Sequence, residues 1–520
     1  MLKRSLIFVH KWLGVLLALL FLMWFVSGLV LYFVPFPSLT TAERLAGLPA
    51  LKLPAGCCLT ADAAGAAAGL TFTDARLGMR GEVPVWRLLA SGAPSVTAGE
   101  GGYEAAGAGG KPRWQAVDAQ TGAVLPPLTA AATTAVAESF SQRPALKAEP
   151  VEEDQWSTAQ SLNAHRPLLR VFMAGDDGLE LYVSPSSGEV LRDTHRAERF
   201  WNWLGAVPHW YYFSQLRDWP GARKNLVIWT ASLGVVAALS GVVLGIWQLF
   251  LNRSRWIPYR QFWPRWHHML GLLAGIVTFT WILSGLLSVN PWGLFSTRDT
   301  SAPERASWTG SASGAAVDPG AALRAAEAAQ PGLAAREIDL LRVAGQAWYR
   351  VRGQSADAQQ LVRADAAPGA QPKAAALLPD ALMQSTLTGL RGSPAKWGVP
   401  VVTRLDRYDA LYYAREYESD TNKKFNRPLP VWRAEWADGV AVYVDPASGR
   451  VLMRQDLSNR VQRVLYNGLH SLDFRFLMER PWLRTPLVVL LSLLGVALSV
   501  TSCVLAWRAL VPRRRERAFP

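Results

Sequence analysis

The sequence predicts an α+β integral membrane protein with four transmembrane helices, arranged as two parallel repeats that each carry an α+β segment outside the membrane. Three observations predict this class: four long apolar stretches, basic residues gathered beside them, and a set of residues that recurs at a nearly constant offset. Half of the 520 residues are hydrophobic, 18% are charged, and the mean hydropathy is +0.10. Together with the four apolar stretches, this composition excludes a soluble enzyme, a collagen-like chain and a disordered chain.

The four apolar stretches are each close to the ~20 residues that a helix needs to cross a bilayer. They cover residues 6–34, 226–250, 270–289 and 487–507, and Lys11 is the one charged residue inside them. The first stretch is too long for the apolar core of a signal peptide, so we expect an uncleaved helix. The predicted division is transmembrane helices at 1–34, 224–250, 266–289 and 485–508, extramembrane segments at 35–223 and 290–484, a basic loop at 251–265 and a tail at 509–520.

The net charge of +14 is concentrated in short segments beside the apolar stretches. These segments contain Lys3, Arg4 and Lys11, then Arg253, Arg255, Arg260 and Arg265, and finally Arg508, Arg513, Arg514, Arg515 and Arg517. Basic residues at membrane borders follow the positive-inside rule, which places both termini and the middle loop in the cytoplasm. The two extramembrane segments then lie on the opposite side, and the charge does not indicate nucleic-acid binding.

The two halves of the chain share one residue pattern. His10, Gly14, Trp24, Ser27, Gly28 and Leu29 recur 257 residues later as His267, Gly271, Trp281, Ser284, Gly285 and Leu286. At an offset of 261, Arg199, His209, Phe213 and Arg223 recur as Arg460, His470, Phe474 and Arg484. Each copy reads helix, extramembrane segment, helix, so we predict a duplication with a pseudo-twofold axis along the membrane normal.

Each extramembrane segment is expected to contain two small α+β modules. Turns of one shape, with Asp or Ser first and Gly last, follow β-rich runs at 118–122, 184–188, 365–369 and 445–449, which is typical of hairpins. Asp318 and Pro319 predict a helix start, with Gly332 closing that helix. Residues 98–110 and 300–320 are expected to be loops or linkers. Cys57 and Cys58 are adjacent, and no disulfide is expected between them.

Several of these motifs resemble the PepSY-associated transmembrane proteins of bacteria. They are H-K-W-L-G at 10–14, V-D-P-A-S-G-R-V-L at 444–452 and N-G-L-H at 467–470, in the order and duplication described above. The resemblance implies a bacterial inner-membrane location and periplasmic PepSY-like segments at 35–223 and 290–484. The family includes ferric-siderophore reductases and iron-regulated membrane proteins, and its reductase members bind haem through membrane histidines. Some relatives carry a cytoplasmic flavin or nicotinamide domain, and this chain ends at Pro520 without one.

The resemblance directs attention to four of the seven histidines, because they form two repeat-matched pairs. His10 and His267 are expected near the cytoplasmic face, and His209 and His470 near the periplasmic face. Ionisable residues in membranes are costly and usually functional, so we predict that each pair supplies the axial ligands of one haem b, giving two haems in all. Gly14 lies one helical turn after His10 and would leave a flat slot for a macrocycle. The alternative is that the glycines only allow close helix packing.

Other residues are weaker candidates. His268 neighbours His267 and is an alternative ligand, while His165 and His195 are expected on the surface of the extramembrane modules. Haem propionates need cations, so arginines matched across the repeat are candidate propionate contacts, although arginines that only snorkel to the interface are more common. These arginines are Arg199, Arg460, Arg223 and Arg484.

The function implied by the resemblance is a haem-containing inner-membrane oxidoreductase that passes electrons to a periplasmic acceptor, with a ferric siderophore as the first candidate. The chain lacks a dinucleotide-binding G-x-G-x-x-G, a P-loop, a nucleophile elbow and H-E-x-x-H. A cytoplasmic reductase or a membrane quinol would therefore supply the electrons, and membrane lipid is the other expected partner. A homo-oligomer is compatible with the sequence. Two alternatives stay open: a non-catalytic PepSY-type periplasmic binding or regulatory protein, and part of a siderophore or metal transporter.

Overall fold

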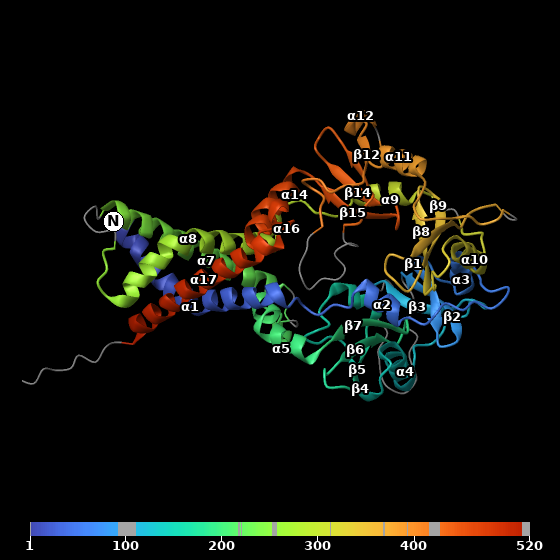
Figure 1. Cartoon of the computed structure of the whole chain (residues 1–520), viewed down its shortest axis with the longest axis horizontal. Helices are drawn as coiled ribbons and strands as arrows, with labels where there is room; N and C mark the ends of the chain where they lie inside the picture. The colour runs from blue at the N-terminus through green and yellow to red at the C-terminus, as the bar shows by residue number, and fades with distance from the viewer. Residues whose placement is uncertain are drawn as a thin grey trace, which may run out of the picture.

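The computed structural model describes residues 2–91, 111–216, 219, 221–251, 257–311, 314–367, 370–392, 394–414 and 427–511. The molecule is elongated, with a bundle of long helices at one end and the β-sheets at the other (Figure 1). The first residues of the chain lie at the end of the bundle that is distant from the sheets.

Four helices form the bundle: α1 (Leu2–Phe33), α7 (Ala222–Leu251), α8 (Phe262–Ser288) and α17 (Pro481–Leu510). Each is long and apolar enough to span a membrane, since a helix of about 20 residues already crosses the hydrocarbon core. The four predicted spans are therefore confirmed, and the protein is a multi-pass membrane protein. Each helix begins four to eight residues before the apolar stretch that predicted it.

Small residues bring these helices together. Both α1 and α8 pack against α7 and α17. A Cβ atom at Gly234 in α7 would lie 3.0 Å from Ile282 and 3.1 Å from Phe21, and one at Gly495 in α17 would collide with the ring of Phe25. Glycine at these two crossings allows the close approach that is common in membrane bundles.

The β-rich part contains one large sheet, in the order β11-β10-β9-β8-β1-β2-β3. Its strands are β1 (Phe72–Arg80), β2 (Val83–Ala90), β3 (Arg113–Asp118), β8 (Glu337–Val343), β9 (Gln346–Arg352), β10 (Gln359–Arg363) and β11 (Ala374–Ala375). β1 and β8 pair antiparallel, with Leu77 opposite Ile338. The first modules of the two segments therefore join in one sheet, a pairing that the sequence did not predict. The reason is a shared core, because α3 (Ala61–Ala67) and α10 (Pro319–Ala329) contribute to the same apolar cluster.

Two smaller antiparallel sheets complete this part, with strands in the orders β4-β5-β6-β7 and β12-β13-β14-β15. The first comprises β4 (Ala145–Val151), β5 (Leu168–Met173), β6 (Glu180–Ser184) and β7 (Glu189–Thr194), and it packs against α4 (Ala130–Ser141). The second comprises β12 (Val401–Leu405), β13 (Val431–Glu435), β14 (Ala441–Asp445) and β15 (Arg450–Gln455), and it packs against α11 (Asp380–Gly389). The predicted hairpins at 184–188 and 445–449 are confirmed, and Gly188 and Gly449 adopt the positive φ that these turns require.

The remaining helices are short. They are α2 (Thr41–Gly47), α5 (Arg196–Leu204), α6 (Ala206–His209), α9 (Ala302–Thr309), α12 (Pro394–Trp397), α14 (Leu457–Gln462), α15 (Leu469–Ser471) and α16 (Arg475–Met478), with 3-10 turns at Gln160–His165, Ser214–Leu216 and Pro291–Gly293 and a π-helical turn at Arg463–Gly468. The predicted start of α10 at Asp318 and Pro319 is confirmed, and the helix ends three residues before Gly332.

Two expectations about local structure are wrong. Residues 300–320 are not a simple linker, because Ser301 and Glu304 cap α9 reciprocally and its Trp308 is buried in the core. Cys57 and Cys58 are joined by a disulfide across a cis peptide bond, with their Cα atoms 3.1 Å apart. The predicted loop at 98–110 and the end of the turn at 365–369 lie outside the described residues.

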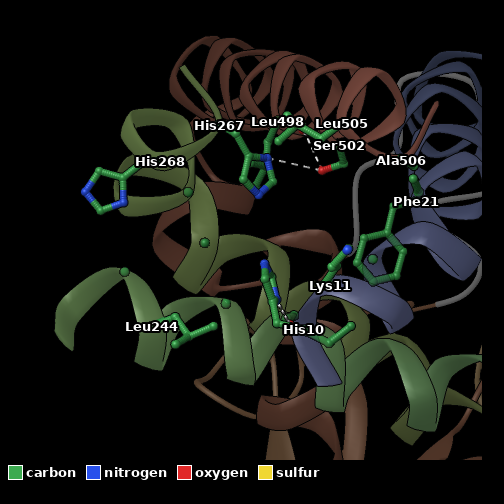
Figure 2. A pocket seen from close by; sticks show the side chains of 18 of the residues that line it. His10, Lys11, Phe21, Leu244, His267, His268, Leu498, Ser502, Leu505 and Ala506 are labelled. Atoms are coloured by element: carbon green, nitrogen blue, oxygen red, sulfur yellow. Dashed lines mark hydrogen bonds between the residues drawn. The ribbon is translucent and has the colours of Figure 1, made fainter. Parts of the chain in front are cut away.

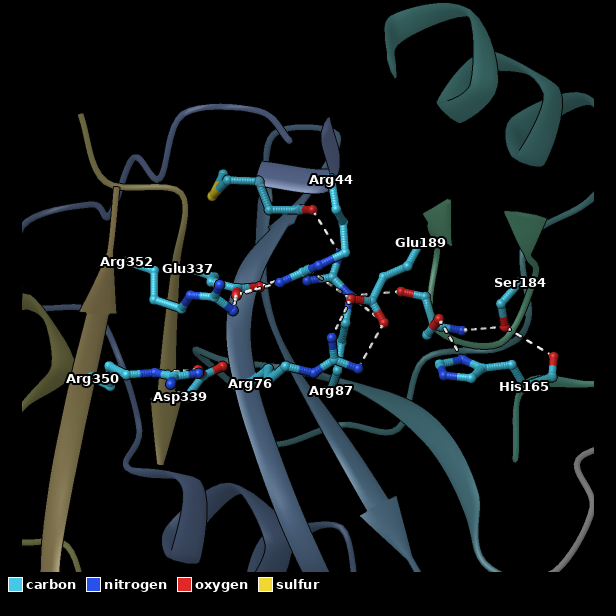
Figure 3. Close-up of polar contacts among 12 residues, drawn as sticks. Arg44, Arg76, Arg87, His165, Ser184, Glu189, Glu337, Asp339, Arg350 and Arg352 are labelled. Carbon is cyan, nitrogen blue, oxygen red and sulfur yellow. Dashed lines mark hydrogen bonds and ion pairs between the residues drawn. The ribbon is translucent and has the colours of Figure 1, made fainter. Parts of the chain in front are cut away.

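A buried ionic cluster ties the two extramembrane segments together (Figure 3). Arg44 of α2 donates to both carboxylate oxygens of Glu337 in β8, at 2.9 and 2.5 Å. Glu189 of β7 lies 3.0 Å from Arg76 of β1. Burial alone would raise the pKa of Glu189, but the charges of Arg76 and Arg87 outweigh it and lower the pKa to about 2. The cluster therefore holds α2, β1, β7 and β8 in one arrangement.

Candidate functional site

Two histidines from different helices face each other (Figure 2), toward the end of the bundle that lies away from the sheets in Figure 1. His10 comes from α1 and His267 from α8, each near the start of its helix, and their ring centroids are 6.2 Å apart. An imidazole–metal bond is about 2.0–2.1 Å long, so two imidazoles on opposite sides of one metal ion would have ring centroids ~6 Å apart. The spacing of this inner pair, His10 and His267, matches that requirement.

Hydrogen bonds fix which nitrogen of each inner histidine is protonated. The Nδ1–H of His10 donates to the carbonyl oxygen of Ala237 in α7, at 3.1 Å. His267 Nδ1 lies 3.1 Å from Thr501 Oγ1 of α17, whose own hydroxyl donates to the carbonyl oxygen of Leu498. The threonine oxygen therefore accepts the Nδ1–H of His267. In both rings Nε2 is left with its lone pair, as an axial metal ligand requires.

The second pair, His209 and His470, lies at the bundle end near the sheets, and we call it the outer pair. His209 ends α6, His470 lies in α15, and their ring centroids are 6.0 Å apart. Each Nδ1 is 3.1 Å from a serine hydroxyl, Ser27 of α1 for His209 and Ser284 of α8 for His470. Both serine hydroxyls donate to the carbonyl oxygen three residues earlier in the chain, so each serine oxygen accepts a hydrogen bond from the Nδ1–H of its histidine. Nε2 of both histidines is therefore unprotonated.

Both pairs line cavities of the size that organic ligands occupy, roughly 300–1,000 Å³. The inner cavity measures about 450 Å³ and is lined by His10 and His267, and the outer cavity measures about 680 Å³ and is lined by His209 and His470. Phe21 of α1 lines both cavities, so the two spaces approach each other at this side chain.

Glycines form the walls beside the histidines. A Cβ atom at Gly14 would meet nothing within 4 Å, and one at Gly271 would meet only Leu498 at 4.0 Å. Both residues line the inner cavity one helical turn beyond His10 and His267. Gly28 and Gly285 line the outer cavity, where a Cβ would lie 3.1 and 3.4 Å from the Cε1 atoms of His209 and His470. The glycines thus leave open space beside the inner pair, whereas at the outer pair the histidine rings pack directly against them.

His268, the alternative ligand, also lines the inner cavity. Its ring packs against Tyr259 at a centroid distance of 5.4 Å and lies to the side of the His10–His267 pair in Figure 2. The structure therefore brings His267, not His268, face to face with His10.

The four candidate arginines divide into two groups. Arg223 and Arg484 line the outer cavity, and Arg484 donates to the carbonyl oxygen of Ser471. Arg199 and Arg460 do not line either cavity. They donate to the backbone carbonyl oxygens of Gly178 and Gly439 in the extramembrane part.

The two remaining histidines line neither cavity. His165 is buried, with its ring stacked on Trp114 at 5.6 Å and its Nδ1 3.3 Å from Ser187 Oγ. The expectation of a surface position is therefore wrong for His165, because Trp114 and the β6–β7 turn cover it. His195 precedes α5, and its half-exposed side chain lies 3.3 Å from Asp177.

Sequence analysis missed the hydroxyl partners of the histidines. Ser27 and Ser284 belong to the recognised repeat, but no role was expected for them. Ser240 lies 3.3 Å from His10 Nδ1 and is matched at the 261-residue offset by Thr501, which contacts His267. The match between Ser240 and Thr501 at this offset is the sequence signal for the pair. Among the described residues, no group of three or more His, Cys, Asp or Glu side chains could hold a metal ion.

These features define a multi-pass membrane protein with an α+β extramembrane part and two cavities lined by histidine pairs. The chain belongs to the PepSY-associated TM region family, whose model matches residues 7–378 and thus includes α1, α7, α8 and the joined sheet. No curated protein matches the chain.

Proposed function

We propose that this protein is a haem-containing oxidoreductase of the bacterial inner membrane, which passes electrons across the membrane to a periplasmic acceptor such as a ferric siderophore. The observation that carries the proposal is the geometry of the two histidine pairs. Ring centroids 6.2 and 6.0 Å apart, with each Nδ1 engaged, suit two bis-imidazole haem b sites.

The residues present fit haem better than they fit a bare metal ion. The outer cavity is lined by two histidines and the inner cavity by three, and neither has a carboxylate among its lining residues within the described part of the chain. Protein sites for single metal ions usually supply three or four ligands, and no three His, Cys, Asp or Glu side chains among the described residues are grouped to hold one. The open space beside Gly14 and Gly271 would accommodate the flat ring of a macrocycle.

The proposed roles of the chain's own residues follow from this placement. His10 and His267 hold the inner haem, His209 and His470 hold the outer haem, and Arg223 and Arg484 bind propionates of the outer haem. Each haem, when bound, supplies a one-electron ferric–ferrous couple. Phe21 lines both cavities and therefore lies between the two proposed haem sites.

The proposed topology places both termini and the basic loop in the cytoplasm and both extramembrane segments in the periplasm, as two parallel repeats. The inner pair then faces the electron source, which we assign to a cytoplasmic reductase or a membrane quinol. Each electron delivered reduces one ferric ion to ferrous at the periplasmic side, and siderophores hold ferrous iron much less tightly, so the metal is released.

The first test is the absorption spectrum of the purified protein. We expect a Soret band that shifts when dithionite is added, and two haems per chain by pyridine haemochrome assay. A colourless protein that stays apo after incubation with haem would contradict the proposal and favour a non-catalytic periplasmic binding or regulatory role.

A further inference from the structure

Lys11 and His268 occupy equivalent positions beside the inner histidine pair. Each directly follows one of the paired histidines, and the two are matched at the same 257-residue offset. Both line the inner cavity. In Figure 2 they lie to opposite sides of the His10–His267 pair.

His268 carries a polar atom that lacks a partner. Its side chain is 8% exposed, and Nε2 is buried without a hydrogen-bond partner in the described part of the chain. Buried polar atoms in proteins are almost always hydrogen-bonded, and an exception indicates a missing ligand or water. An acceptor bound in the inner cavity would satisfy this nitrogen.

Lys11 brings a positive charge to the same cavity. Its ammonium lies 5.0 Å from the ring centroid of Trp12, and the cavity's lining residues within the described ranges include neither Asp nor Glu. A lysine at a membrane border extends its apolar stem along the helix and its charge toward water. Side chains on a helix tilt toward its N-terminus, and both α1 and α8 begin at this end of the bundle (Figure 1).

We propose that Lys11 and His268 bind the two propionate carboxylates of the inner haem, one each, at the edge of the macrocycle that faces the cytoplasm. This inference rests on the proposed function. Haem carries both carboxylates on one edge, placed symmetrically about a line through the iron. Two residues that follow symmetry-matched ligands are placed to meet one carboxylate each, one by charge and one by a hydrogen bond from the imidazole.

The test measures haem release from the inner site alone, in protein that carries His209→Ala and His470→Ala. Transfer of haem to excess apomyoglobin gives the release rate. We expect Lys11→Met and His268→Leu each to accelerate release by about tenfold, as loss of a hydrogen bond to a charged group predicts. Lys11→Arg and His268→Gln keep a donor and should stay near the parent rate. Lys3→Met, which removes the same charge outside the cavity, is the matched control.

Haem dimethyl ester provides the decisive comparison, because its carboxylates are blocked. With the ester, the parent protein should release the macrocycle as fast as the variants do, and neither substitution should have a further effect. Unchanged release of haem b from both variants would overturn the propionate assignment while leaving the proposed function intact. Loss of the spectrum of six-coordinate haem iron in His268→Leu would also overturn the propionate assignment, because His268 would then be an axial ligand. A parent protein that binds no haem would overturn both proposals.

Discussion

Arg44 and Glu337 form a bidentate ion pair between residues that are 293 positions apart in the chain. Arg352 donates to the same carboxylate at 2.9 Å, and the Glu337 side chain is 3% exposed. Burial alone would raise the pKa of Glu337, but the neighbouring charges of Arg44 and Arg352 lower it. The carboxylate is therefore charged at neutral pH and pairs with two guanidinium groups where the extramembrane segments meet.

Glu337→Gln should destabilise the extramembrane part strongly. Removing one partner of a buried ion pair leaves uncompensated charge and typically costs about 3–5 kcal/mol. Thermal unfolding followed by tryptophan fluorescence in detergent would measure the loss. The matched control is Glu479→Gln, which breaks the exposed Arg475–Glu479 pair at 2.7 Å and should change stability by less than about 0.5 kcal/mol. Equal effects of the two variants would contradict the structural role of the cluster.

Lowering the pH should reduce the folding stability of the extramembrane part through the titration of His165. Burial lowers the pKa of His165 to about 4, from an ordinary value of 6.5. Between these values the unfolded chain binds a proton that the folded chain does not, so stability falls as pH decreases from 6.5 to 4, by up to ~3 kcal/mol. Glu189, with its pKa lowered to about 2, adds a further loss below pH ~4.5.

His165→Phe isolates the histidine contribution, since a phenyl ring can still stack on Trp114. Urea unfolding between pH 7 and 4 should show a shallower loss of stability in the variant than in the parent. Parallel pH profiles for the two proteins would show that His165 does not titrate in this window.

The sequence predicted the features that local pattern determines and missed those that depend on distant contacts. The four spans follow from apolarity alone, and recurrence at one offset indicated that His10 should be considered with His267. The pairing of β1 with β8 was not predictable, because the strand patterns do not specify which edges meet. The burial of His165, at the end of a 3-10 turn, also depends on Trp114, which lies 51 residues earlier in the chain, in β3 of the large sheet.

The proposed haem sites at the two histidine pairs predict a specific pattern of haem loss. His10→Ala and His267→Ala should each remove the inner haem and leave about half of the haem per chain, because bis-imidazole ligation fails when either ligand is absent. His209→Ala and His470→Ala should do the same for the outer haem. Double variants within a pair should be no worse than single variants, and His195→Ala should leave haem content unchanged.

Haem quantification with low-temperature spectra would distinguish the two sites. Full haem content with unaltered spectra in all four variants would contradict the ligand assignment. Loss of the inner haem in His268→Ala but not in His267→Ala would identify His268, the next residue in the chain, as the ligand. Loss of both haems in His10→Ala would show that the sites are coupled or differently paired.

A large side chain at position 14 should block the inner site sterically. A leucine there would project into the inner cavity, where the structure leaves open space beyond Cβ. Gly14→Leu should therefore abolish inner haem binding while outer haem and folding are retained, and Gly14→Ala should have a smaller effect. A control substitution on the outward face of the same helix, Leu19→Phe, should leave both haems in place. Retention of both haems in Gly14→Leu would show that the macrocycle does not lie against this wall.

Cysteine labelling tests the proposed orientation in the membrane. In a background with Cys57, Cys58 and Cys503 replaced by serine, Arg4→Cys and Glu82→Cys place single thiols on the exposed start of α1 and on the exposed tip of the β1–β2 hairpin. A membrane-impermeant maleimide added to intact spheroplasts should label the thiol at position 82. It should label the thiol at position 4 only after lysis, because the positive-inside rule places the basic start of the chain in the cytoplasm. Labelling of position 4 in intact spheroplasts would show that the topology is the inverse of the proposed one. The inner histidine pair would then face the periplasm and the proposed electron acceptor.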